Sequence, residues 1–195
     1  YITGFHELCK STGRYQLDNQ NKAIVDMKSD ETPVTDVDIH SSELIVNFIK
    51  RKFPQDVIIS EENKEENNAY NSYWLVDPID GTKNYISGGG QFCICIALIE
   101  ENYPVFGIIY VPSKKQFYYA IKNEGCYLME DDKSLQALKI KNTPLQNILL
   151  SSSIRKSVIN VISNHLPSHR IIQLSSAIKF AMIASSNGVF SVRLG

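Results

Sequence analysis

Acidic side chains follow two short apolar segments of this sequence, at the point where each segment ends. Glu61 and Glu62 come directly after one apolar run, and Asp77 and Asp80 follow the next. If the two segments are neighbouring strands, three or four carboxylates meet at one sheet edge, where each like-charge pair at about 4 Å would cost about 4 kcal/mol at an effective dielectric constant of about 20. Such a cluster needs a cation, and oxygen ligands without His or Cys favour Mg²⁺ over zinc.

The segment that contains the two aspartates can aim several oxygen atoms at one ion and hold an anion beside it. Pro78 fixes its own φ and favours an extended Asp77, so that both Asp carboxylates and the Ile79 carbonyl can face the same point. If a helix begins just after this segment, the backbone N–H groups of Gly81 and Thr82 attract a phosphate oxygen. Carboxylates, Mg²⁺ and an anion site together favour phosphate ester hydrolysis, in which paired metal ions activate water and stabilise the leaving oxygen.

A second motif supplies a candidate general base. We expect Thr82 to orient the attacking water and Asp38 to accept its proton through the Thr82 hydroxyl, provided that the fold brings the two residues together. Asp38 stands three residues after Thr35, so the same pair also matches a capping box at a helix N-terminus. The two roles are compatible, because a cap also fixes the direction of the Asp38 carboxylate.

The spacing of apolar side chains predicts the elements that must position these residues. Two helices are expected in the first third of the chain, at 1–14 and 35–53, and the polar residues 16–22 predict a loop. Pro54 stops the second helix. The strands that are expected to deliver the acidic residues lie at 57–59 and 73–76.

The middle of the chain alternates apolar runs with short polar turns. This spacing predicts an antiparallel meander of four strands, at 92–99, 105–111, 116–121 and 126–129. After residue 131 the pattern is typical of an α/β arrangement, with strands at 148–150, 171–174 and 189–192 and helices at 157–165 and 177–184. We therefore predict an α+β metal- and phosphate-binding domain over 1–130 and an α/β domain over 131–195.

Composition and charge argue against several classes of protein. The 195 residues are 43% hydrophobic and 21% charged, and a net charge of −1 with dispersed basic residues does not indicate a nucleic-acid groove. The four cysteines lack CxxC spacing and suit a reducing environment, so a cytoplasmic protein is expected. No apolar run approaches a membrane span, and no signal peptide is visible. Cys93 and Cys95 alternate in an apolar strand and are expected to be core residues. Tyr118 and Tyr119 would face opposite sides of their strand, one in the core and one at the surface.

Three separated motifs resemble the lithium-sensitive inositol monophosphatase superfamily. They are PVTDVD at 33–38, SEE at 60–62 and WLVDPIDGTKNY at 74–85. Within that superfamily the chain is most similar to the CysQ-type 3′(2′),5′-bisphosphate nucleotidases. The features that favour this branch are Lys83 after DGT, the strand at 92–100, IKF at 178–180 and VRLG at 192–195.

The resemblance implies a layered αβαβα sugar-phosphatase fold, two or three bound Mg²⁺ ions and sensitivity to lithium. It implies that a small phosphorylated substrate, adenosine 3′,5′-bisphosphate, is hydrolysed to AMP and phosphate, with inositol monophosphate or another sugar phosphate as the alternative. The implied site comprises the metal ligands Glu61, Asp77, the Ile79 carbonyl and Asp80, the substrate-binding residues Gly81, Thr82 and Lys83, and the catalytic pair Asp38 and Thr82.

The chain departs from the family pattern in three places. The Ser-Arg-Ser-His stretch of the nucleotidases is not reproduced at 151–155, which weakens the expectation of a nucleotide substrate more than that of a phosphatase. Family members continue beyond Gly195 into a Trp-Asp segment whose Asp completes the second metal site. We therefore expect either a fragment with an incomplete second domain, which hydrolyses phosphate esters poorly, or a non-catalytic metal-binding remnant. Ser175 stands where the family has a glycine, which would alter the close approach of backbone and ligand there.

Overall fold

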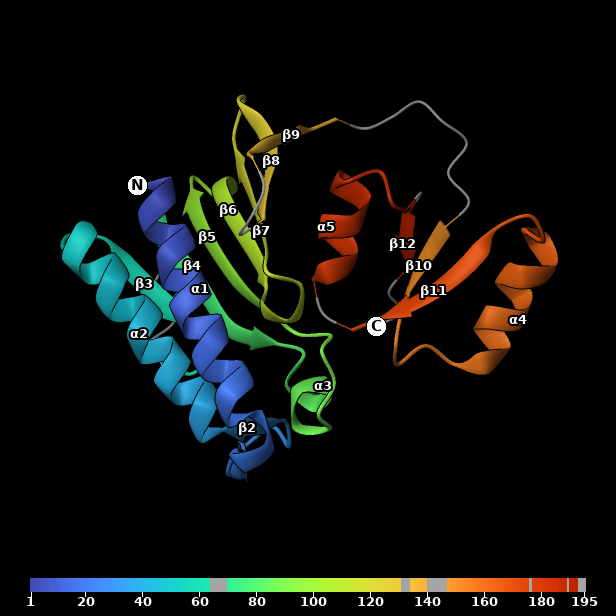
Figure 1. The fold of residues 1–195 in the computed structure, drawn as a ribbon, viewed down its shortest axis with the longest axis horizontal. Coiled ribbons are helices and arrows are strands. Elements are labelled where there is room, and N and C mark those ends of the chain that lie inside the picture. The colour runs from blue at the N-terminus through green and yellow to red at the C-terminus, as the bar shows by residue number, and fades with distance from the viewer. Residues whose placement is uncertain (64–69, 131–133, 140–146, 176, 189, 193–195) are drawn as a thin grey trace.

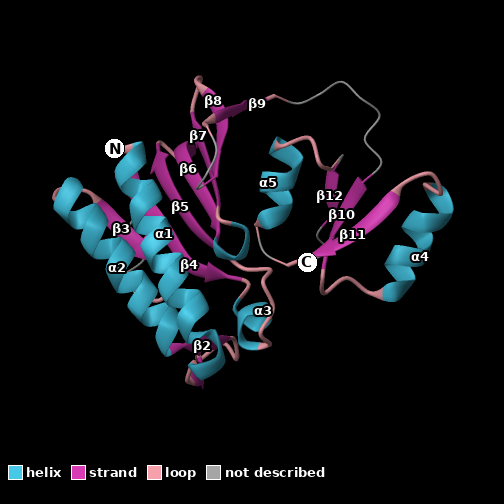
Figure 2. Cartoon of the chain, in the orientation of Figure 1, coloured by secondary structure: helices cyan, strands magenta, loops and turns pink. Residues whose placement is uncertain are grey.

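Helices and sheets alternate in layers across the molecule (Figures 1 and 2). The computed structural model describes residues 1–63, 70–130, 134–139, 147–175, 177–188 and 190–192. Helices α1 (Ile2–Asn19) and α2 (Asp36–Lys52) cover one face of a seven-stranded sheet, and α5 (Ile178–Ala184) lies between that sheet and a three-stranded sheet. Helix α4 (Lys156–His165) covers the outer face of the smaller sheet. The layers therefore follow the αβαβα order that the resemblance implies.

The first helix is longer than its sequence pattern predicts. Helix α1 reaches Asn19 and continues into the 3₁₀ turn η1 (Gln20–Lys22), so the expected loop at 16–22 is wrong. The helix contains Gly13, which lies so close to the sheet that an added Cβ would be 2.6 Å from Tyr110 Cε1. This glycine permits a close helix–sheet contact and does not break the helix.

Helix α2 begins where the sequence predicts a cap. The Thr35 hydroxyl accepts a hydrogen bond from the Asp38 backbone N–H at 3.2 Å, and the Asp38 carboxylate accepts one from the Thr35 backbone N–H at 2.9 Å. This reciprocal pair is a capping box. The helix ends at Lys52, two residues before Pro54, as expected.

The larger sheet carries the predicted acidic residues. Its strand order follows the chain: β3 (Val57–Ser60), β4 (Ser72–Asp80), β5 (Cys93–Glu100), β6 (Tyr103–Val111), β7 (Gln116–Ile121), β8 (Gly125–Glu130) and β9 (Gln136–Leu138). Strands β3 and β4 are parallel and the other neighbours are antiparallel, which confirms the expected meander. The 3₁₀ turn η2 (Pro112–Lys114) joins β6 to β7.

Strand β4 continues beyond its predicted end at Val76. It reaches Asp80, and its register against β5 shifts between Asp77 and Asp80. Pro78 lies within this irregular stretch, because a proline has no N–H to donate and is tolerated in a strand at a bulge. The irregularity separates the two aspartates and so governs how their carboxylates are directed.

The last part of the chain has the predicted α/β alternation. Strand β10 (Asn147–Ser151) pairs in parallel with β11 (Arg170–Leu174) and with β12 (Phe190–Val192). Residue 189 of the last expected strand and residues 131–133 at the expected domain boundary lie outside the described residues. Strand β9 was not predicted and belongs to the larger sheet, and the division into two domains stays a prediction. Among the described helices, none combines the length and the apolar character needed to cross a bilayer.

Both faces of the larger sheet are covered. Tyr119 packs in the core beneath α1 and α2, and Tyr118 packs on the opposite face with Ile178 of α5. Each tyrosine is 7% exposed, so the expectation that one of them lies at the surface is wrong. The reason is that helices bury the sheet from both sides. Cys93 and Cys95 also lie on the α5 face, within the core as expected.

Candidate active site

Asp77 lies among other carboxylates near the end of β4. Because β3 and β4 are parallel, Glu61 emerges beside β4, and its backbone N–H donates to the Val76 carbonyl at 2.9 Å. Burial, and to a smaller extent the nearby carboxylates of Glu61 and Asp80, together raise the pKa of Asp77 to about 9. Among the described residues, Asp77 Oδ1 is buried without a hydrogen-bond partner. The structure thus brings these three acidic residues together.

Asp80 is tied to helix α5. Its Oδ2 accepts a hydrogen bond from the Ala177 backbone N–H, just before the helix, and the Cys93 thiol lies 3.8 Å from the same oxygen. Burial raises the pKa of Asp80, although the Ala177 hydrogen bond and the positive charge of Lys179 act in the opposite direction. The acidic site is therefore closed on one side by a segment far away in the sequence.

Lys28 joins two acidic residues and was missed by sequence reasoning. Its Nζ lies 3.1 Å from Glu61 Oε1 and 3.0 Å from a carboxylate oxygen of Glu62. Partial burial lowers the pKa of Lys28, but its hydrogen bonds to Glu62 and Glu61 outweigh that effect and the net shift is upward. Lys28 follows the first strand of the hairpin formed by β1 (Val25–Met27) and β2 (Pro33–Thr35). A single lysine in a polar stretch belongs to no recognisable motif, so the sequence could not predict that the hairpin places Lys28 beside Glu61 and Glu62.

Asp38 and Thr82 meet as predicted, although 44 residues separate them. The Thr82 hydroxyl lies 3.4 Å from Asp38 Oδ1 and 3.1 Å from the Ile79 carbonyl oxygen. Burial raises the pKa of Asp38, while hydrogen bonds from Thr35 and Thr82 favour its charged form. A buried carboxylate in contact with a hydroxyl can receive a proton through that hydroxyl.

The other predicted residues surround Thr82. The Ile79 side chain is buried in the core, so only its carbonyl could reach an ion. Gly81 precedes helix α3 (Thr82–Ile86) with φ of +105°, a conformation that favours glycine. The first N–H groups of α3 have no acceptor within the helix, and the Lys83 side chain is exposed.

Ser175 takes part in contacts between the two sheets. Its backbone N–H donates to Gln91 Oε1 at 2.9 Å, and its hydroxyl lies 3.2 Å from the Ser152 hydroxyl. Ser152 follows β10, and Gln91 precedes β5. Ser175, which stands where the family has a glycine, therefore links the smaller sheet to the larger one.

The acidic residues fit a divalent cation with oxygen ligands. Burial raises the pKa of Asp77 and Asp80 when no cation compensates them, and Asp77 Oδ1 is an unpartnered acceptor among the described residues. Hard cations such as Mg²⁺ prefer such carboxylate and carbonyl oxygens. The roles of Glu61, Asp77, Ile79 and Asp80 as ligands stay predictions.

A cavity of about 680 Å³ lies next to these carboxylates, between the larger sheet and α5. Its lining includes Glu61 and Asp77, and the small residues Ala97 and Gly107 leave room along the sheet. The acidic residues can therefore be reached by a small molecule.

The sequence model of the inositol monophosphatase family matches residues 5–195. The chain belongs to the inositol monophosphatase family. It is thus a member of a family of phosphatases, in agreement with the three motifs. A curated relative, the 3′(2′),5′-bisphosphate nucleotidase CysQ of Aggregatibacter actinomycetemcomitans, is 32% identical over 184 residues, which cover 90% of this chain and 68% of the relative.

Solved structures of the inositol monophosphatase family share the fold. The Thermotoga maritima IMPase TM1415 has a TM-score of 0.81 at 22% identity, and the match covers 97% of this chain and 74% of that one. CysQ from Bacteroides thetaiotaomicron has a TM-score of 0.74 at 25% identity, over 96% of this chain and 78% of that one. An IMPase/NADP phosphatase complexed with Mg²⁺ and phosphate has a TM-score of 0.71 at 20% identity, over 92% of this chain and 69% of that one.

Proposed function

We propose that this protein is a Mg²⁺-dependent phosphomonoesterase that hydrolyses adenosine 3′,5′-bisphosphate to AMP and phosphate. The observation that carries the proposal is the grouping of Asp77 with the Glu61 and Asp80 carboxylates. Thr82 follows Asp80 by two residues and contacts Asp38. One group of residues suits a metal ion, and the other suits proton transfer from water.

Each group of residues has a separate role in the proposed hydrolysis. Glu61, Asp77, Asp80 and the Ile79 carbonyl would hold Mg²⁺, which when bound lowers the pKa of water and stabilises the leaving oxygen. Asp38 accepts a proton that passes through the Thr82 hydroxyl. The Gly81 and Thr82 N–H groups and the exposed Lys83 ammonium bind the phosphate.

Support for a nucleotide substrate comes from the names of the relatives. The CysQ proteins of Aggregatibacter actinomycetemcomitans and of Buchnera aphidicola subsp. Acyrthosiphon pisum are each 32% identical to this chain and are named 3′(2′),5′-bisphosphate nucleotidases. Inositol monophosphate is the second candidate, because the Thermotoga neighbour is named an IMPase. A comparison of the two substrates separates these possibilities.

The test is phosphate release from adenosine 3′,5′-bisphosphate and from inositol 1-phosphate, each with and without Mg²⁺. We expect Mg²⁺-dependent release with a higher kcat/KM for the nucleotide. Asp77→Asn removes a ligand and should lower kcat/KM by at least about 100-fold, the upper end of what loss of an outer-shell partner costs. Glu100→Gln, an exposed carboxylate at the far end of β5, is the matched control and should leave release unchanged.

Three results would contradict the proposal. Full activity of Asp77→Asn would exclude the metal site, and preference for inositol 1-phosphate would exclude the nucleotide. Mg²⁺ binding by calorimetry without release of phosphate from either substrate would identify a metal-binding remnant.

A further inference from the structure

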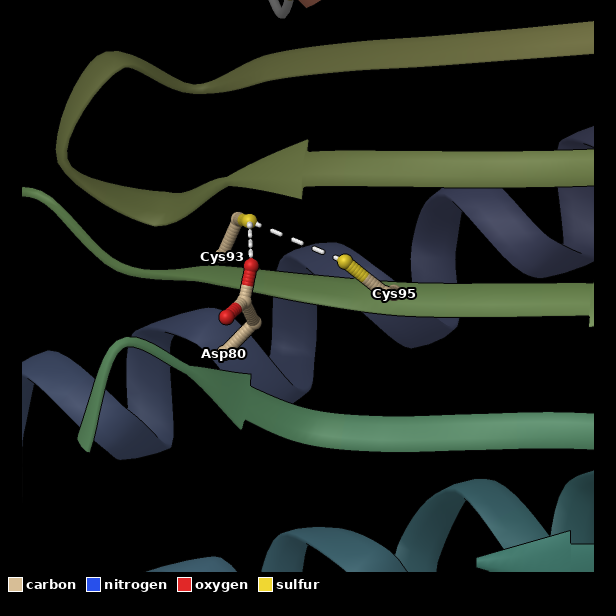
Figure 3. Close-up of side chains that lie close together, drawn as sticks. All are labelled: Asp80, Cys93 and Cys95. Atoms are coloured by element: carbon tan, nitrogen blue, oxygen red, sulfur yellow. Dashed lines mark hydrogen bonds between the residues drawn. The ribbon is translucent and has the colours of Figure 1, made fainter. Parts of the chain in front are cut away.

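Two thiols extend the acidic site with sulfur atoms (Figure 3). In the β4–β5 pairing Cys93 lies opposite Asp80 and Cys95 lies opposite Asp77. Cys93 Sγ is 3.8 Å from Asp80 Oδ2 and 3.7 Å from Cys95 Sγ. All three atoms lie within 4.8 Å of one another. Three potential ligand atoms therefore converge at the corner where β4 and β5 meet.

These separations match a known coordination geometry. In a tetrahedral zinc site, Zn–S bonds of about 2.3 Å place two sulfur atoms about 3.8 Å apart, and a carboxylate oxygen bound at about 2.0 Å lies about 3.5 Å from each sulfur. The observed sulfur–sulfur distance of 3.7 Å and sulfur–oxygen distance of 3.8 Å lie close to both values. The third separation, between Cys95 Sγ and an Asp80 carboxylate oxygen, is at most 4.8 Å, so an ion could bind between the three atoms once this pair moves closer together.

We propose that Asp80, Cys93 and Cys95 form a binding site for a thiophilic divalent ion such as Zn²⁺ or Cd²⁺. Cys95 lines the 680 Å³ cavity, which gives the ion a route and can supply a water molecule as the fourth ligand. The two thiol protons are released to solvent as the metal–sulfur bonds form. Mg²⁺ does not compete for the sulfur atoms, because it prefers oxygen ligands.

The site shares Asp80 with the proposed Mg²⁺ ligands. A zinc ion held there withdraws one carboxylate from Mg²⁺, so thiophilic ions inhibit the Mg²⁺-dependent reaction. This inhibition rests on the proposed function, whereas binding of the thiophilic ion does not.

Cd²⁺ titration of the protein tests the site directly. With a phosphine reductant present, we expect an ultraviolet thiolate-to-Cd²⁺ charge-transfer band that saturates at one ion per chain. The double variant Cys93→Ser/Cys95→Ser should lose the band and bind Cd²⁺ at least about 100-fold more weakly. Cys126→Ser is the matched control, because this thiol lines the same cavity outside the three-residue cluster, and it should keep the band.

The outcomes separate the metal site from the proposed function. A band that is absent from the wild type, retained in the double variant or lost in Cys126→Ser would overturn the site. Circular dichroism of each variant checks that it is folded, and Cys95→Ser alone, at the half-buried position, should already weaken the band. The band without any phosphatase activity would leave the site standing and remove the proposed enzyme. Activity that Zn²⁺ inhibits in the wild type and not in the double variant would support both.

Discussion

Asp38 uses its two carboxylate oxygens for different contacts. Oδ2 accepts hydrogen bonds from the Thr35 backbone N–H and hydroxyl, and Oδ1 faces the Thr82 hydroxyl at 3.4 Å. The first oxygen fixes the start of α2, and the second remains directed at the proposed reaction. Capping box and general base are therefore compatible roles for one side chain.

Replacement of the Thr82 hydroxyl tests this arrangement. Thr82→Val keeps nearly the same volume but removes the group between Asp38 and the Ile79 carbonyl. We expect phosphate release to fall by about 10²- to 10⁴-fold, the usual contribution of a positioned proton transfer. Thr82→Ser retains a hydroxyl and should keep most of the activity. Normal turnover by the valine variant would mean that the proton follows another route.

The pKa of Asp77 makes stability depend on pH. The folded protein keeps a proton on Asp77 up to a pH of about 9, whereas the unfolded chain releases it near 3.8. The stability that this proton contributes is fully present below 3.8 and is lost as the pH rises through about 9. Raised pKa values of Asp38, Asp80 and Glu62 act in the same direction.

We therefore expect the free energy of unfolding of the metal-free protein to fall as the pH rises across this range. Urea denaturation in the presence of a chelator measures it. Asp77→Asn should flatten the slope, because the amide has no proton to release. An equal slope in the variant would assign the pH dependence to other groups.

Motifs predicted the acidic residues but not everything around them. The DPIDGT segment and strand-end position were sufficient for Glu61, Asp77, Asp80 and Thr82. Cys93 and Cys95 were predicted only as core residues, because the side chains opposite them follow from the β4–β5 register, which spacing does not give.

At the scale of the elements, β6 has a glycine that its strand does not require. Gly107 lines the cavity, and an added Cβ would meet no atom within 4 Å. Gly107→Ala should stabilise the protein by about 0.4–1 kcal/mol, because it reduces the freedom of the unfolded chain. Gly13→Ala is the contrasting variant and should destabilise, since its Cβ would lie 2.6 Å from Tyr110 Cε1. Thermal denaturation compares the two, and destabilisation by Gly107→Ala would show that the cavity cannot accept the methyl group.

The boundaries of the elements were the least predictable feature. Helix α1 passed through its glycines and β4 passed through Pro78 because tertiary contacts outweighed local propensity. Helix α2 was predicted closely, since the Thr35 cap and Pro54 are local signals that act without distant partners.

At the scale of the whole molecule, Trp74 joins both long helices to the larger sheet. Its ring centroid lies 5.5 Å from that of Phe5, 5.2 Å from that of Phe53 and 6.1 Å from that of Phe106. Trp74→Ala should reduce the free energy of unfolding by about 3–5 kcal/mol, as expected for loss of a large buried ring. Tyr103→Ala, at a side chain that is 67% exposed, should change it by less than about 0.5 kcal/mol. Equal effects in urea denaturation would contradict this assignment of the core.

The layer order could be anticipated from the alternation of elements and the family resemblance. The connection between Asp80 and Ala177 could not, because 97 residues separate them and no local pattern links a strand end to a distant helix. Long-range contacts of this kind complete the candidate site, whereas short-range motifs predict only its acidic residues.

The ammonium group of Lys28 has a consequence for metal affinity. It pairs with Glu61 and Glu62, so an ion that binds Glu61, a proposed ligand, would have to displace this intramolecular counter-ion. The measured dissociation constant for Mg²⁺ would then reflect how strongly Glu61 binds Mg²⁺ relative to the Lys28 ammonium group. Lys28→Met should accordingly bind Mg²⁺ more tightly in calorimetry, while Lys28→Arg should not. If Glu61 is a metal ligand, this one side chain on the β1–β2 hairpin would weaken Mg²⁺ binding and ease its release.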